Sequence, residues 1–197
     1  MHIILVRHAT CAQMDSVLLG RSIDAPLDAN GEVQARALAE RLLPLDDLLL
    51  ECSPRQRTRQ TAGAIALRRC GQVQAAPAMD EIDFGSWSGR TFAELAGDPA
   101  WRRWNEQRST ACTPAGENIE QVQARAMAHL RQLQQDCSAR TVAIVTHAEI
   151  VRSLVLRATN APIDDYHRIE ISPASLTTFS MDGPELRVTA LNERVSV

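Results

Sequence analysis

The sequence alternates short apolar runs with longer stretches whose apolar residues recur at helical spacing. Residues 2–6, 48–50 and 141–146 are almost wholly apolar, which is typical of strands buried on both faces of a parallel sheet. Residues 117–135 instead place apolar side chains three and four positions apart, as in an amphipathic helix. Strands that alternate with helices predict an α/β protein, a three-layer α/β/α sandwich with a mostly parallel central sheet.

Further helices are predicted from capping residues. Asp28 or Asn30 can cap a helix after the loop over residues 9–28, because a short polar side chain accepts hydrogen bonds from the first free backbone N–H groups. Ser53 and Pro54 predict a second helix that runs to about Arg69. A third is expected over 150–156. The apolar stripe expected for the first of these helices consists of Val33, Ala37, Leu38 and Leu42.

The C-terminal part has the pattern of a hairpin. Residues 176–179 and 186–188 are short strand-like runs, and the turn-forming pair Asp182 and Gly183 lies between them. We expect this hairpin to supply an antiparallel edge strand to the sheet.

Length and charge restrict the function classes. The 197 residues suit one domain spanning 1–197, since single cores stop growing at about 250–300 residues. A net charge of −3 gives no field that would attract nucleic acid or an anionic membrane surface, so neither is expected as a partner. All 21 basic residues are arginine, which excludes the lysine of a P-loop and a lysine Schiff base.

The cysteines and the first residues bear on the compartment. Five widely spaced cysteines without a C-x-x-C pair argue against a disulfide framework and favour a reducing cytoplasm. The apolar run at residues 3–6 is too short for a signal peptide or a membrane span. We expect a cytoplasmic monomer or homodimer.

Polar residues follow three of the predicted strands. Arg7 and His8 follow the first, residues 53–57 follow the second, and His147 ends another. In open α/β sheets ligands bind outside the carboxyl ends of the strands. Two imidazoles and two guanidinium groups meeting there suit a dianion, because the guanidinium fork matches phosphate and a neutral imidazole can attack phosphorus. A carboxylic acid would be needed to protonate the leaving alkoxide.

At these positions the chain resembles the histidine phosphatase superfamily, also called phosphoglycerate mutase-like. Residues 5–10 resemble the family's R-H-G motif, residues 24–31 its D-x-P-L-x-x-x-G segment, and residues 53–62 its S-P-L-x-R-A-x-x-T-A helix start. Residues 81–89 are similar to the segment that carries the acid glutamate, and residues 145–148 to that of the second histidine. The order of the motifs along the chain strengthens the resemblance.

The resemblance implies a site without metal or cofactor. It implies that His8 is the nucleophile and Glu81 the proton donor. Arg7, Arg57 and His147 would form the phosphate pocket, and all five residues are expected to be catalytic. Ala148, next to the second histidine, and Arg21 are expected to contact the substrate, although an arginine such as Arg21 is by default exposed to solvent.

Glu81 has two neighbouring competitors for the acid role, Asp80 and Asp83, and only the motif position favours it. Its carboxyl should be protonated when the alcohol leaves and ionised when water attacks, so a pKa near neutrality would suit it. We expect the negative charges of Asp80 and Asp83 to raise that pKa.

Four residues depart from the family pattern. Ala9 replaces a glycine, Arg55 replaces an apolar residue, Thr58 replaces an alanine, and Met14 stands where many members have a phosphate-binding asparagine. Met14 predicts a pocket for a less polar substrate. Trp101 and Trp104, at helical spacing, are candidates for a wall of that pocket.

The expected activity is metal-independent hydrolysis of a small-molecule phosphomonoester through a phosphohistidine. The compact segment between Glu81 and His147 favours hydrolysis over the alternative, a cofactor-dependent phosphoglycerate mutase. α-Ribazole 5′-phosphate or a sugar phosphate is the expected substrate, and the 114–117 segment resembles α-ribazole phosphatases. An alternative of another class is a non-catalytic phosphate-binding module. The chain contains no C-x5-R, H-E-x-x-H or G-x-S-x-G motif, which argues against cysteine phosphatase, zinc and serine hydrolase chemistry.

Overall fold

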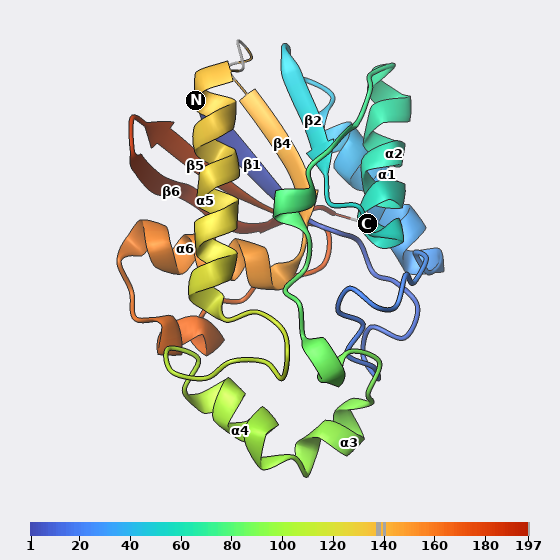
Figure 1. The fold of residues 1–197 in the computed structure, drawn as a ribbon. Helices are drawn as coiled ribbons and strands as arrows, with labels where there is room; N and C mark the ends of the chain where they lie inside the picture. Colours follow the sequence, from blue (N-terminus) through green and yellow to red (C-terminus); the bar gives the residue numbers. More distant parts are fainter. Residues whose placement is uncertain (137–138, 140, 197) are drawn as a thin grey trace.

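The computed structural model describes residues 1–136, 139 and 141–196, and its centre is a six-stranded sheet with helices on both faces (Figure 1). The strand order is β3-β2-β4-β1-β5-β6. This arrangement confirms the predicted three-layer sandwich. The strands are β1 (His2–Arg7), β2 (Leu48–Cys52), β3 (Gln74–Ala75), β4 (Thr141–Thr146), β5 (Ser175–Asp182) and β6 (Glu185–Arg194).

Strand pairing follows the sequence patterns. β4 lies between β1 and β2 and is parallel to both, while β5 is antiparallel to β1 and to β6. The turn between β5 and β6 contains Gly183, whose φ of 53° is the left-handed conformation that glycine adopts without steric cost. The hairpin therefore forms the antiparallel edge that the sequence predicts.

The helices are of two kinds, long ones that cover the sheet and short ones at its end. The α-helices are α1 (Ala29–Leu42), α2 (Gln56–Arg69), α3 (Phe92–Ala96), α4 (Pro99–Glu106), α5 (Ile119–Asp136) and α6 (Ala148–Thr159). Three short 3-10 helices are η1 (Pro77–Met79), η2 (Gly85–Trp87) and η3 (Ile163–Arg168). No described helix is long and apolar enough to cross a membrane.

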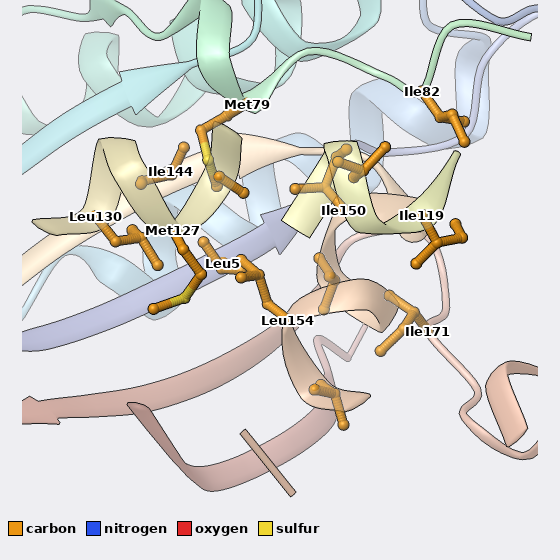
Figure 2. Close-up of a cluster of buried hydrophobic side chains, with 14 of the residues drawn as sticks. Leu5, Met79, Ile82, Ile119, Met127, Leu130, Ile144, Ile150, Leu154 and Ile171 are labelled. Carbon is orange, nitrogen blue, oxygen red and sulfur yellow. The ribbon is translucent and has the colours of Figure 1, made fainter. Parts of the chain in front are cut away.

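Alternate residues of β1 and β4 enter two separate cores. Leu5 and Ile144 pack against α5 and α6, and Figure 2 shows them among the buried side chains of that face. Val6 and Val145 pack against α1 and α2 on the other face. Burying a branched aliphatic side chain contributes roughly 1.5–3 kcal/mol, so the two-sided apolar runs fix the central strands firmly between the helix layers.

Two local predictions are wrong. Val33 is 42% exposed, because α1 turns Ala35 and Ala39 toward the core in its place. Helix α2 begins at Gln56 with Arg55 at its N-cap, so Ser53 and Pro54 do not start it. The cap of α1 is as expected: the Asp28 carboxylate accepts a hydrogen bond from Gly31 N.

Helices α3 and α4 lie together at one end of the molecule, apart from the two layers that cover the sheet (Figure 1). Asp98 caps α4 and Thr91 forms a capping box with Glu94 at the start of α3. These two helices, only five and eight residues long, are not among the elements predicted from the sequence. Together with the loop over residues 9–28 they surround the space beyond the strand ends.

Candidate active site

A cavity of about 260 Å³ opens at the carboxyl ends of β1 and β4. Its polar end is lined by Arg7, His8, Arg57, Glu81 and Ala148. His147 does not line the cavity but is fully buried behind it, with its ring centre 5.3 Å from that of His8. The structure thus brings together every sequence-predicted site residue except Arg21.

His8 is held in one tautomer. Its Nδ1 lies 2.8 Å from the carbonyl oxygen of Ala9, and since a carbonyl only accepts, Nδ1 carries the hydrogen. The Nε2 lone pair is then free. Burial, followed by the positive charges of Arg57 and Arg7, holds the pKa of His8 well below its usual value. The imidazole is therefore neutral and nucleophilic at physiological pH.

The two predicted phosphate-binding arginines are anchored by backbone carbonyls. Arg57 is 1% exposed and its Nη2 donates to Gly20 O at 3.0 Å, while Arg7 Nη1 donates to Ile171 O at 2.6 Å. The Nε atoms of both are buried and have no hydrogen-bond partner among the described residues. Two fixed guanidinium groups beside His8 make this end of the cavity suited to a dianion.

The N-terminus of α6 adds to the positive electrostatic potential at this part of the cavity. His147 is its N-cap residue and Ala148 its first residue, and Ala148 lines the cavity. The first backbone N–H groups of a helix point outward and carry partial positive charge, which favours an anion.

A chain of hydrogen bonds orients His147. Its Nδ1 accepts from Arg57 Nη2 at 3.2 Å, which places the ring hydrogen on Nε2, and Nε2 lies 2.7 Å from Ser53 Oγ. Ser53 Oγ in turn donates to Asp80 Oδ1 at 3.0 Å. Burial and the charge of Arg57 hold the pKa of His147 well below its usual value, so this ring is also neutral.

The carboxyl group of Glu81 has the pKa expected of an acid that works near neutrality. Burial raises its pKa to about 7 against the opposing charge of Arg57, and the carboxylate of Glu149 adds to the rise. Asp80 and Asp83, which were expected to raise this pKa, are not its cause. Asp80 pairs with Arg21 and Arg55, and Asp83 Oδ1 accepts a hydrogen bond from Gly85 N. Glu81 Oε2 lies 3.6 Å from His147 Nδ1.

Arg21 lies behind the Glu81 segment and is not among the residues that line the cavity. Its Nε donates to Glu81 O at 2.6 Å and its Nη2 to the Glu117 carboxylate at 2.8 Å. Arg125 donates to the same carbonyl and the same carboxylate. Glu117 belongs to the 114–117 segment, so in this structure that segment and Arg21 fix the position of the acid.

The departures from the family pattern have structural consequences. Arg55 donates to Arg21 O and pairs with Asp80, which ties the start of α2 to the Glu81 segment. Met14 lines the cavity, and its Sδ lies 3.6 Å from Arg7 Nη2. Of the two tryptophans, Trp101 lines the cavity and Trp104 is wholly buried in the core.

Two groups of polar residues at the site were not predicted from the sequence. One is the Ser53–Asp80 pair, for which the place of Ser53 directly after a buried strand was the available signal. The other is the Glu149 carboxylate with Arg108 and Arg152, both of which pair with it at the cavity wall. Burial alone would raise the pKa of Glu149, but these two arginines lower it below its usual value. Arg152 lies one helical turn after Glu149, a spacing that allows an ion pair, but no pattern in the sequence joins Arg108 to them.

In the described part of the chain no three His, Cys, Asp or Glu side chains are grouped so that they could hold a metal ion. Cys11, Cys52, Cys70 and Cys112 are free thiols, and the fifth cysteine, at position 137, lies outside the described residues.

Comparisons with known proteins identify the family. The sequence profile of the histidine phosphatase superfamily (branch 1) matches residues 3–194. An acid phosphatase of Mycobacterium tuberculosis is 30% identical over 180 residues, which cover 88% of this chain and 83% of that protein. The adenosylcobalamin/α-ribazole phosphatase of Escherichia coli is 24% identical, with 98% of this chain and 97% of that protein covered.

Among solved structures, a mycobacterial glucosyl-3-phosphoglycerate phosphatase in complex with VO3 superimposes with a TM-score of 0.87. It is 25% identical, and the match covers 98% of each chain. The chain therefore belongs to the histidine phosphatase superfamily and is a phosphoric monoester hydrolase, as its motifs predict.

Proposed function

We propose that this chain hydrolyses small-molecule phosphomonoesters without a metal ion, through a phosphohistidine formed on His8. The observation that carries the proposal is the Nδ1–H to Ala9 O hydrogen bond of a neutral His8, which leaves Nε2 as a free nucleophile at the polar end of the cavity. Arg7, Arg57 and the backbone N–H of Ala148 surround the place that a phosphoryl group would take.

In the first step His8 Nε2 forms a bond to phosphorus as the ester P–O bond breaks. The alkoxide takes the proton of Glu81, whose pKa of about 7 keeps the carboxyl substantially protonated near neutrality. The guanidinium groups of Arg7 and Arg57 balance the charge on the equatorial oxygens, a task that a metal ion performs in other phosphoryl-transfer enzymes.

In the second step a water oxygen attacks phosphorus and the N–P bond breaks. The ionised Glu81 accepts the proton of that water, and His8 returns to its neutral state as inorganic phosphate leaves. His147 supports both steps by holding Arg57, to whose Nη2 its Nδ1 is bonded.

The finer assignments are part of the same proposal. α-Ribazole 5′-phosphate or a sugar phosphate is the candidate substrate class, and the E. coli relative is named for the former. We place the enzyme in the cytoplasm, consistent with the four free thiols of the described residues.

The test is hydrolysis of 4-nitrophenyl phosphate in the presence of EDTA by the intact chain, His8→Ala and His167→Ala. The His167 side chain is exposed and does not line the cavity, so this variant is the matched control. We expect turnover by the intact chain and the control, with an acid-labile phosphoenzyme, and loss of both in His8→Ala. Binding of phosphate without any turnover would indicate the non-catalytic module.

A second assay separates phosphatase from mutase. The enzyme is given 3-phosphoglycerate together with 2,3-bisphosphoglycerate, and phosphate release is compared with isomerisation. Isomerisation faster than phosphate release would contradict the hydrolase proposal.

A further inference from the structure

Part of the cavity lining beyond the residues proposed to hold phosphate is apolar. Met14, Val17 and Leu18 come from the loop over residues 9–28, while Phe84 precedes η2, Phe92 begins α3 and Trp101 lies in α4. We call these six side chains the leaving-group chamber. Building on the proposed phosphatase activity, we propose that the chamber selects phosphomonoesters whose alcohol carries a flat apolar ring.

The chamber is held in place by its backbone. Leu18 N donates to Arg90 O at 2.9 Å, Gly89 N to Leu18 O at 2.8 Å, and Phe92 N to Ser16 O at 3.0 Å. These bonds fasten the loop to the start of α3. A wall that is ordered before the substrate arrives loses little conformational entropy on binding.

The aromatic side of the chamber is equally fixed. Trp101 meets Trp87 edge to face, with ring centres 5.2 Å apart. Trp87 is buried, and its Nε1 donates to Asp98, the cap residue of α4. Trp101 is thereby presented to the cavity as a rigid surface against which a second ring can pack.

The polar groups near the chamber are already paired with one another. Tyr166 OH donates to Asn105 Oδ1 at 2.9 Å, and Asn105 Nδ2 donates to Trp101 O at 2.8 Å. Arg108 and Arg152 both pair with Glu149. Among the polar side-chain atoms of these described residues, Arg108 Nε is buried and unpartnered, and it offers one donor.

Because these polar groups are already paired, the chamber disfavours alcohols rich in hydroxyl groups, and so argues against the sugar phosphate of the two candidate substrates. A sugar entering the chamber would lose its hydrogen bonds to water and meet aliphatic and aromatic carbon, and burying a hydroxyl group without a partner is unfavourable. A ring without hydroxyl groups loses nothing comparable and buries apolar surface. The chamber therefore favours a ring-bearing alcohol over a polyol of similar size.

The experiment compares two esters of primary alcohols, 2-phenylethyl phosphate and glycerol 1-phosphate. Because both leave as alkoxides, the difference in kcat/KM reports the contacts of the alcohol more than its leaving ability. We expect kcat/KM to be at least about tenfold higher for the phenylethyl ester, the size of effect that a few apolar contacts produce.

Substitutions in the chamber test whether its side chains cause the preference for the phenylethyl ester. Trp101→Ala should lower the ratio of the two kcat/KM values severalfold, and Trp101→Phe should retain most of it. Arg103→Ala is the matched control, because Arg103 lies on the same helix, is exposed and does not line the cavity; its ratio should equal that of the unmodified chain. If Trp101→Ala does not fold, Phe92→Ala takes its place, since Phe92 is 37% exposed.

Equal kcat/KM values for the two esters, or a preference for glycerol 1-phosphate, would overturn this inference alone. An unchanged ratio in both Trp101→Ala and Phe92→Ala would overturn the assignment of the chamber. Failure to hydrolyse either ester and also 4-nitrophenyl phosphate would overturn the proposed function itself.

Discussion

The surroundings of His8 and Glu81 set the protonation state that each of them needs for the reaction. Burial and two arginines keep His8 neutral, whereas burial next to Glu149 keeps the carboxyl of Glu81 protonated up to about pH 7. The same loss of solvent therefore produces a neutral base and a neutral acid side by side. The rate should depend on pH through Glu81 in particular.

We predict that kcat/KM for an alkyl phosphate such as 2-phenylethyl phosphate falls as the pH rises through about 7, since Glu81 must be protonated when the alkoxide leaves. With 4-nitrophenyl phosphate the falling limb should weaken, because nitrophenolate leaves without a proton. Rate profiles from about pH 5 to 9 check this. The same falling limb for both esters would rule out proton donation by Glu81.

The Ser53–Asp80 pair acts on a different property, the tautomer of His147. Without Ser53 Oγ the Nε2–H has no acceptor, and the hydrogen can move to Nδ1, where it faces Arg57 Nη2. We predict that Ser53→Ala lowers kcat by roughly tenfold to a hundredfold and that Ser53→Thr, which keeps the hydroxyl, restores much of it.

The imidazole ¹⁵N chemical shifts of His147 provide the second measurement, because they report which nitrogen is protonated. A loss of kcat with an unchanged tautomer in Ser53→Ala would show that Ser53 matters for packing only. Ser16→Ala, at an exposed position, is the control.

Among the elements, α1 carries part of the site through its first turn. Asp28 accepts from Gly31 N and from Thr10 Oγ1, and so links the start of α1 to the loop that follows His8. A Cβ on Gly31 would lie 1.9 Å from Thr10 O, far inside van der Waals contact. Glycine is therefore required for the close approach of this helix to the catalytic loop.

We predict that Gly31→Ala destabilises the protein by about 1–3 kcal/mol, the usual cost of forcing an extra methyl group into a packed site, and also lowers kcat. Gly63→Ala is the contrasting variant: Gly63 lies within α2, and a Cβ there meets nothing within 4 Å. That change should stabilise the protein by about 0.5–1 kcal/mol. Urea denaturation compares the two, and equal effects would contradict the steric argument.

For the whole molecule, the sequence predicted the sandwich, the long helices and the terminal hairpin. Strands buried on both faces appear as continuous apolar runs, and helices that cover a sheet appear as apolar residues at helical spacing. The motifs predicted Arg7, His8, Arg57, Glu81 and Ala148, all of which line the cavity, and Arg21, which does not. The short helices α3 and α4, the Ser53–Asp80 pair and the grouping of Arg108 with Glu149 were missed. The two residue pairs depend on contacts between positions distant in sequence, which neither periodicity nor spacing encodes. The two helices are too short to show a periodic apolar stripe, and only their local caps, Thr91 with Glu94 and Asp98 before Pro99, mark them in the sequence.

The pKa shifts of the site also affect the stability of the whole fold. The folded pKa of Glu81, about 7, lies above its ordinary value of 4.5, so the stability it contributes is fully present below pH 4.5 and is lost as the pH rises through about 7. His8 and His147 act in the opposite sense: their folded pKa values are lowered, so stability is lost as the pH falls below 6.5. The pH dependence of the free energy of unfolding of the unmodified protein is the sum of these contributions.

Glu81→Gln isolates the contribution of the acid. At about pH 4 the variant should have nearly the stability of the unmodified chain, and above about pH 8 it should be more stable by roughly 3 kcal/mol, the value that the pKa shift of Glu81 corresponds to. Free energies of unfolding in urea across this range, for both proteins, measure the difference. A difference that does not grow between these two pH values would mean that Glu81 titrates normally in the folded protein, and the acid role proposed for it would lose its physical basis.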